Sequence, residues 1–242
     1  MYDHLFKQET MIDNSTVAKN IHEKGWSHAG RLKEDVAREF REYFDGCIWY
    51  NYHVKGHQVN PISDRRTAPS NCSSVAMQDV VLAPHWFEAS LKMTDIVTEY
   101  FGTKDIVLYS YNIFYSNPAG PNYEGVQTWH RDHDSENFLA LFVYLTDVLT
   151  IEDGAHAFEQ KDGQRVDIFG PAGTMFFADT RQMHMGHKPR INARAMAWAR
   201  WSLNPNPRTY EIDGLSPVDK NLLGDRYPKD AVIQNIIRKV VV

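Results

Sequence analysis

A histidine and an aspartate in the middle of the chain have the types and the spacing of metal ligands. His130 directly follows Trp129, and Asp132 lies two positions after His130. Side chains two positions apart point to the same face of an extended strand, so the imidazole and the carboxylate would enter the same space. A second imidazole would complete a 2-His-1-carboxylate triad, which binds non-heme Fe(II) on one side and leaves the opposite coordination positions open. The pattern therefore predicts a further histidine later in the chain.

Two candidates for that histidine, His184 and His187, lie in the region 179–194. His184 follows Asp132 by 52 positions. This is room for the intervening strands of a barrel, so the two side chains could meet across it. His187 would otherwise be a loop residue near the mouth of the cavity.

An arginine begins a strand pattern ten positions after His184. Arg194 and Arg200 share one face of this pattern, and alanines occupy the other face. A guanidinium binds a carboxylate through two parallel hydrogen bonds, and its burial is too costly without an anionic partner. A dicarboxylate co-substrate would supply that partner for Arg194. Arg200 is either a second carboxylate contact or the partner of a nearby acid.

Five short motifs surround these residues: WHRD at 129–132, YLTDV at 144–148, DGAH at 153–156, GTMFFADT at 173–180 and HMG at 184–186. Together with Arg194 they resemble the phytanoyl-CoA dioxygenase family of Fe(II)/2-oxoglutarate oxygenases, over roughly residues 105–203. The resemblance implies His130, Asp132 and His184 as the iron ligands, and it favours His184 over His187. It also implies that Arg194 pairs with the distal carboxylate of 2-oxoglutarate, and that the core is a double-stranded β-helix (jelly roll, cupin-like).

The activity that the resemblance implies is oxidation of a small organic substrate. Fe(II), 2-oxoglutarate and O2 would be used, with release of succinate and CO2. Related halogenases carry a small residue in place of the carboxylate ligand. Because Asp132 is present, we expect hydroxylation or another oxidation and not halogenation.

Two other classes of protein could use the same triad. One is a cupin-like binding module without turnover, and the other is a Zn-dependent isomerase or hydrolase. Release of succinate would distinguish the oxygenase from both. Residues 130–137 also match the spacing of the protein-kinase catalytic loop. A kinase is not expected, because the kinase signature also needs a Gly-rich loop and no G-x-G occurs in the chain.

Several residues near the motifs have two possible roles. Tyr144 and Trp198 could line the pocket, although aromatic residues on buried strands are more often core. His133 and Asp134 could face the substrate or form an exposed polar turn. His156 is expected to be structural, and the Gly-Ser-His element common in the family is not reproduced after it.

The surrounding pattern predicts a mainly β fold with flanking α-helices in one domain, residues 1–242. Residues 1–30 are expected to be irregular, and loops are expected over 51–75 and 117–125, where together with the C-terminal segment they would form a lid. The domain would comprise N-terminal helices over about 30–102, a jelly-roll core over about 105–203 and an extension over 204–242. Helical spacing predicts helices at 30–46 and 84–102, and a helix or a closing strand at 230–242. Strands are expected at 105–115, 138–146, 155–160, 165–169, 173–178 and 193–203.

Composition narrows the possible partners. The chain has 242 residues, a net charge of −5 and 43% hydrophobic residues. An acidic chain disfavours broad nucleic-acid binding, and no window approaches 18 consecutive apolar residues, so neither nucleic acid nor a membrane is expected as a partner. Cys47 and Cys72 form no C-x-x-C motif, and the N-terminus does not resemble a signal peptide. We therefore expect a cytoplasmic protein that binds a small-molecule substrate.

Overall fold

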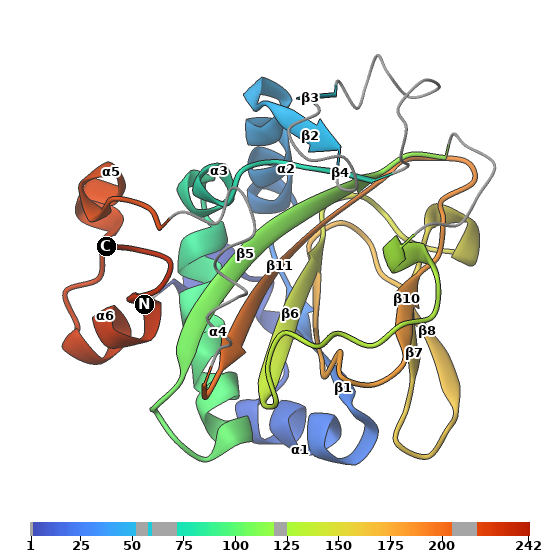
Figure 1. Ribbon diagram of the computed structural model, residues 1–242, viewed down its shortest axis with the longest axis horizontal. Coiled ribbons are helices and arrows are strands. Elements are labelled where there is room, and N and C mark those ends of the chain that lie inside the picture. Colours follow the sequence, from blue (N-terminus) through green and yellow to red (C-terminus); the bar gives the residue numbers. More distant parts are fainter. Residues whose placement is uncertain (1, 52–57, 60–71, 119–124, 205–216) are drawn as a thin grey trace.

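The structure is a computed structural model that describes residues 2–51, 58–59, 72–118, 125–204 and 217–242 (Figure 1). Its helices are α1 (Asn14–Lys24), α2 (Glu34–Tyr43), α3 (Met77–Leu82), α4 (Trp86–Phe101), α5 (Lys220–Leu223) and α6 (Ala231–Ile237). Its strands are β1 (Trp26–Arg31), β2 (Trp49–Asn51), β3 (Gln58–Val59), β4 (Cys72–Ser74), β5 (Val107–Ser116), β6 (Phe138–Tyr144), β7 (His156–Glu159), β8 (Arg165–Ile168), β9 (Thr174–Ala178), β10 (His184–Gly186) and β11 (Arg194–Ser202). None of the described helices is long and apolar enough to cross a membrane.

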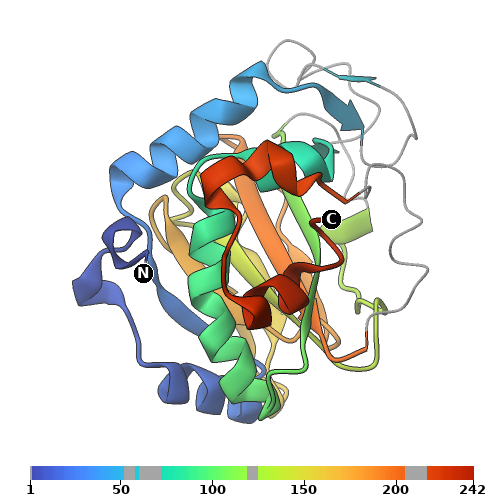
Figure 2. The same cartoon turned by 90° about the vertical axis from the view of Figure 1, so that its left-hand side faces the viewer.

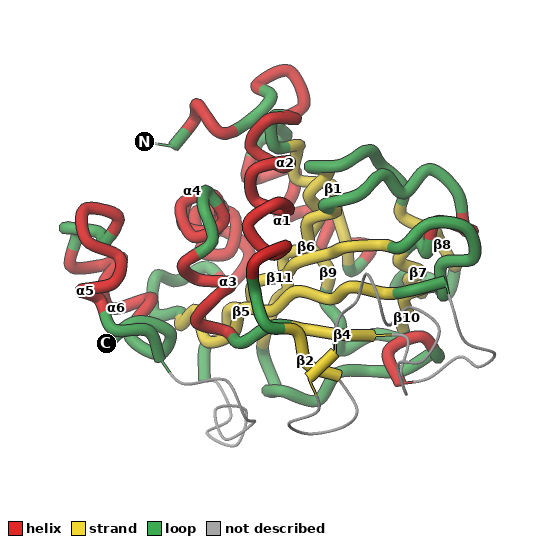
Figure 3. Tube along the Cα trace, turned by 90° about the horizontal axis from the view of Figure 1, so that it is seen from above, coloured by secondary structure: helices red, strands yellow, loops and turns green. Residues whose placement is uncertain are grey.

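The strands form two antiparallel sheets. Within the described residues, the larger sheet has the order β1-β9-β6-β11-β5-β4-β2-β3 and the smaller one the order β10-β7-β8. Seen from above, the helices lie on one side of the larger sheet and the smaller sheet lies at its other side (Figure 3). The predicted fold class, mainly β with flanking helices around a jelly-roll core, is confirmed.

Strand β11 shows how the alternation of side chains separates two cores. Ala195, Ala197 and Ala199 belong to the larger apolar cluster, which contains the buried residues of the helices. Met196 and Trp198 belong to a second cluster, which also contains residues of the smaller sheet. Successive side chains of a strand point to opposite faces, so one strand contributes to both cores. The second cluster is the interior of the jelly roll.

The helical layer rests on the outer face of the larger sheet, with α4 crossing it and the C-terminal helices beside α4 (Figure 2). Phe87 of α4 lies against Tyr111 of β5, with ring centroids 6.4 Å apart. Val36, Ala37 and Phe40 are the buried residues of α2. The helices predicted at 30–46 and 84–102 are confirmed, with shorter bounds.

The prediction of an irregular N-terminus was wrong. Residues 14–24 form α1, and β1 pairs with β9 in the larger sheet. The Asp13 carboxylate accepts a hydrogen bond from the Thr16 backbone N–H at 2.9 Å and so caps the helix. Gly25 ends it in the left-handed conformation, with φ of 91°. Only Val17, Ala18 and Ile21 are buried on this helix. Its other residues are mostly polar, so the sequence shows no clear helical spacing of apolar residues here.

Other boundaries also differ from the predictions. Helix α4 begins two residues after Pro84. Two short strands lie within the predicted loop 51–75: β3 pairs with β2, and β4 pairs with β5. Residues 52–57 and 60–71 of that loop lie outside the described residues. The larger part of the predicted loop 117–125 also lies outside them. At the C-terminus, the open choice between helix and strand is resolved as helix α6.

Candidate metal centre

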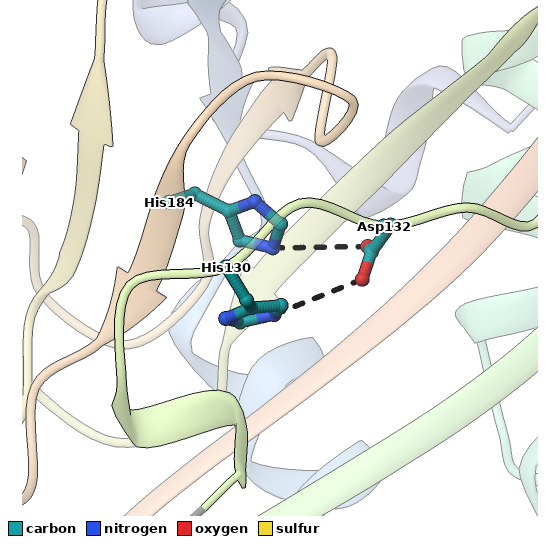
Figure 4. A group of neighbouring side chains, drawn as sticks. All are labelled: His130, Asp132 and His184. Atoms are coloured by element: carbon teal, nitrogen blue, oxygen red, sulfur yellow. Dashed lines mark ion pairs between the residues drawn. The ribbon is translucent and has the colours of Figure 1, made fainter.

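His130, Asp132 and His184 come together in the structure (Figure 4). One ligand atom from each residue lies within 4.8 Å of the others. The backbone explains this approach: His130 N–H donates to the His184 carbonyl and His184 N–H donates to the His130 carbonyl, both at 2.9 Å. Asp132 N–H donates to the Thr180 carbonyl at 2.9 Å. His130 therefore pairs with His184 through an isolated antiparallel bridge, whereas residues 131–133 are not part of a strand, so the predicted strand is reduced to this bridge.

Backbone carbonyls orient both imidazoles. The Nδ1 atom of His130 lies 2.7 Å from the Thr128 carbonyl oxygen, and that of His184 lies 3.0 Å from the Gln182 carbonyl oxygen. A carbonyl only accepts hydrogen bonds, so each Nδ1 carries a proton, and Nε2 is the nitrogen with a free lone pair in the neutral imidazole. The Nε2 atoms face the Asp132 carboxylate, at 3.7 Å from Oδ1 for His130 and 3.7 Å from Oδ2 for His184. Carbonyl-oriented imidazoles of this kind are typical of metal sites.

The Asp132 carboxylate is held by Arg200 of β11. Arg200 Nη2 lies 2.8 Å from Asp132 Oδ2, and Arg200 Nη1 donates to Asp134, which also accepts a hydrogen bond from the Tyr109 hydroxyl at 3.0 Å. Burial raises the pKa of Asp132, but the charge of Arg200, together with that of His184 when its imidazole is protonated in acid, outweighs burial and keeps that pKa below its ordinary value. Of the two roles left open for Arg200, the structure shows the pairing with nearby acids.

The electrostatics keep His184 in the form that a metal needs. Burial lowers the pKa of His184 to about 4, although the Asp132 charge opposes the change. The imidazole is therefore neutral near pH 7. Only a neutral imidazole can coordinate a metal ion, so this side chain needs no deprotonation to become a ligand.

Arg194 is a buried cation at the start of β11, and only 1% of it is exposed. Its Nη1 donates to the Gly154 carbonyl and its Nη2 lies 3.3 Å from the Ser116 hydroxyl. Its Nε has no hydrogen-bond partner, and no acidic side chain pairs with the guanidinium, among the residues that the structure describes. Burial lowers the pKa of Arg194. The described residues therefore do not supply the anionic partner that was predicted for Arg194.

No protein-family model matches the chain, and no curated protein matches it. Solved structures do. SnoN, a non-heme alpha-ketoglutarate-dependent epimerase from nogalamycin biosynthesis, matches with 13% identity and a TM-score of 0.58 over 78% of this chain and 82% of that chain. The carbocyclase SnoK, also from nogalamycin biosynthesis, matches with 18% identity and a TM-score of 0.56 over 77% and 83% of the two chains. HygX from Streptomyces hygroscopicus matches with 13% identity and a TM-score of 0.52 over 77% and 86%.

These likenesses show a shared fold. The SnoN structure has been solved with Fe3+, alpha-ketoglutarate and nogalamycin RO, and the HygX structure with nickel, 2-oxoglutarate and hygromycin B. The chain therefore has the fold of non-heme iron, 2-oxoglutarate-dependent enzymes. Membership of the phytanoyl-CoA dioxygenase family in particular stays a prediction.

The remaining candidates lie apart from the triad. His187 lies 2.8 Å from the Asp167 carboxylate, between Nε2 and Oδ1, and is not one of the clustered ligands. His133 is exposed. The Tyr144 hydroxyl donates to the Ile168 carbonyl at 2.8 Å, and Trp198 packs against Phe114, so both belong to the core.

Two features of the site were missed from the sequence. The pairing of Asp134 with Arg200 joins residues 66 positions apart. The shared face of Arg194 and Arg200 on one strand was a signal that Arg200 enters the interior. His156 was expected to be structural, and its ring lies in the interior with its centroid 5.5 Å from that of His184. Burial and the nearby charges lower the pKa of His156 well below its ordinary value.

Proposed function

We propose that the protein is an Fe(II)- and 2-oxoglutarate-dependent oxygenase that hydroxylates a small organic molecule. The observation that carries the proposal is a clustered His-Asp-His set beside a buried guanidinium without an acidic partner among the described residues. A metal triad alone would fit several chemistries. The guanidinium adds a requirement for an anion, and a dicarboxylate co-substrate meets it.

The donor set fits Fe(II). Two neutral imidazoles and one carboxylate form the facial triad of non-heme iron enzymes, and His130, Asp132 and His184 would supply it. Catalytic zinc sites also use three protein ligands, so the triad does not exclude zinc. A zinc hydrolase or a passive binding module would leave Arg194 buried without a counter-ion. This difference favours the oxygenase over both alternatives.

Each part of the site has a task in the proposed reaction. When bound, the iron would activate O2 in a reaction coupled to oxidative decarboxylation of 2-oxoglutarate to succinate and CO2. Arg194 would bind the distal carboxylate of 2-oxoglutarate, with the Ser116 hydroxyl beside it. Arg200 would orient the Asp132 carboxylate toward the metal. The apolar residues of the inner core would exclude water from the reacting groups.

Hydroxylation is the outcome that the ligand set supports. Asp132 would occupy the coordination position that related halogenases leave to chloride. SnoN and HygX have been solved with nogalamycin RO and hygromycin B, which are small molecules. We therefore propose a small-molecule substrate for this chain as well.

Anaerobic binding of the co-substrate tests the proposal. Fe(II) and 2-oxoglutarate should together produce a visible charge-transfer band in the wild-type protein, and His130→Ala or Asp132→Ala should abolish it. Arg194→Ala should raise the Kd of 2-oxoglutarate at least about tenfold, because a charged hydrogen-bond pair is lost, while metal binding remains. Arg190→Ala is the matched control, because the Arg190 side chain is 68% exposed. A wild-type protein that shows no band, and that releases no succinate in air with any substrate, would contradict the proposal.

A further inference from the structure

His156 of β7 has a buried imidazole whose nitrogens are not hydrogen-bonded to any residue that the structure describes. Only 3% of the residue is exposed, and neither ring nitrogen has a partner within the described part of the chain. Its ring lies among aromatic rings, with its centroid 4.9 Å from that of Phe142 and 5.5 Å from that of Phe176. A phenylalanine or a leucine would fill such a place without leaving a buried polar group unpaired. An imidazole here indicates a partner that the described residues do not provide.

Strand pairing places this ring beside both functional groups of the site. Strand β7 lies beside β10 (Figure 1), and the register of the pair places His156 directly opposite Gly186. Paired residues point to the same face of a sheet, and His184 shares that face because it lies two positions before Gly186. The ring of His156 accordingly stacks on that of His184, with an angle of 17° between the planes.

The guanidinium of Arg194 lies on the same face. A Cβ atom at Gly186 would lie 2.8 Å from Arg194 Nη2, so the guanidinium fills the space that a side chain at this position would need. Arg194 Nη1 also donates to the carbonyl of Gly154, two residues before His156. The ring of His156 therefore stacks on the proposed iron ligand His184, and the proposed carboxylate-binding Arg194 contacts Gly154, two residues before His156, and lies against Gly186, the residue paired with His156.

We infer that His156 is a co-substrate-binding residue whose imidazole N–H donates a hydrogen bond to a carboxylate oxygen of 2-oxoglutarate. This inference rests on the proposed function. A dicarboxylate held by the metal at one end and by Arg194 at the other passes the ring of His156. A neutral imidazole has one N–H donor, and a carboxylate accepts several hydrogen bonds at once. Binding of the co-substrate would satisfy the buried ring.

Two substitutions separate hydrogen bonding from packing. His156→Phe keeps a flat ring between Phe142 and Phe176 but removes the donor, whereas His156→Gln keeps a donor. In anaerobic titrations of the Fe(II)-loaded protein, we expect His156→Phe to raise the Kd of 2-oxoglutarate at least about tenfold, with His156→Gln between it and the wild type. The Kd of Ni²⁺, measured by calorimetry, should be unchanged in both variants. His187→Phe is the matched control, since His187 pairs with Asp167 outside the triad.

The possible outcomes separate this inference from the proposed function. If the wild-type protein does not bind 2-oxoglutarate, the proposed function fails. If the wild type binds it and His156→Phe binds it equally well, only the inference fails. Equal losses in His156→Phe and His156→Gln, or a loss of Ni²⁺ affinity as large as that of 2-oxoglutarate affinity, would also overturn it.

A measurement on the wild type covers the case in which the variants do not fold. In ¹⁵N-histidine-labelled protein loaded with Zn²⁺, 2-oxoglutarate should bring one additional slowly exchanging, downfield imidazole N–H signal. Its absence at saturating 2-oxoglutarate would overturn the inference.

Discussion

Removal of the Arg200 guanidinium should destabilise the metal-free protein far more than the metal-loaded one. Arg200→Met keeps an unbranched stem of four atoms but removes the guanidinium, and so leaves Asp132 and Asp134 without their shared cation. Breaking a buried ion pair costs about 3–5 kcal/mol. The Arg200 side chain is 15% exposed and that of Asp134 is 20% exposed. Solvent screening therefore favours the lower end, about 3 kcal/mol. For a chain of this length, that corresponds to a decrease in Tm of roughly 6–12 °C.

A divalent metal should reverse much of this loss. It brings positive charge to the Asp132 carboxylate, which replaces part of what Arg200 supplied. The increase in Tm on metal binding should therefore be larger in Arg200→Met than in the wild type. The pH dependence has a definite sign. The folded-state pKa of Asp132 is depressed, so its ionic contribution to stability is present above the unfolded pKa and is lost as pH falls through the folded pKa. The difference between variant and wild type should thus shrink in acid.

Thermal unfolding with EDTA, and then with excess Mn²⁺, measures both effects. Arg190→Met removes a 68% exposed guanidinium and is the control, with an expected change in Tm of no more than about 2 °C. Equal losses of stability in metal-loaded and metal-free Arg200→Met would contradict this prediction. In that case Arg200 would stabilise the fold independently of the charge at the metal site.

Two further predictions concern Gly186 and Cys47. In Gly186→Ala the new Cβ would lie 2.8 Å from Arg194 Nη2 and displace the guanidinium, so the Kd of 2-oxoglutarate should rise about tenfold while metal affinity stays unchanged. Unchanged 2-oxoglutarate affinity in calorimetry would show that Arg194 is not its contact. Burial, with a smaller effect of the Asp79 charge, raises the pKa of Cys47 to about 11. At pH 8 its alkylation by iodoacetamide, followed by mass spectrometry, should be at least about tenfold slower than that of free cysteine, and comparable rates would contradict this pKa.

The parts of the fold that follow from local patterns could be predicted from the sequence. Phe138–Tyr144 is an uninterrupted apolar run, and β6 is buried along its whole length. On β11, larger side chains alternate with alanines because the two faces of the strand meet different cores. His130 and Asp132, two positions apart, both reach the candidate metal centre. These features depend on the period of side chains along a strand, which is readable in any short window.

Features that depend on distant partners could not be predicted in this way. The polar helix α1 is stable because three apolar residues pack on the rest of the fold, and its short window shows no strong periodicity. Strand β4 exists because Cys72 and Ser73 pair with the end of β5. The contact of Arg200 with Asp134 requires the antiparallel packing of β11 in the larger sheet. None of these contacts can be predicted from a pattern in the local sequence.

The summed formal charge of the side chains around the two arginines of β11 bears on which ligands the site can hold. The formal charges of Arg194, Arg200, Asp132 and Asp134 sum to zero before anything binds, although both carboxylates pair with Arg200 and not with Arg194. A divalent metal with the dianion of 2-oxoglutarate adds no net charge. A divalent metal with a neutral substrate, as in a zinc isomerase, would leave two uncompensated positive charges in the interior near a buried guanidinium. Uncompensated buried charge is strongly disfavoured, so the arrangement of charges favours a metal and a dicarboxylate binding together.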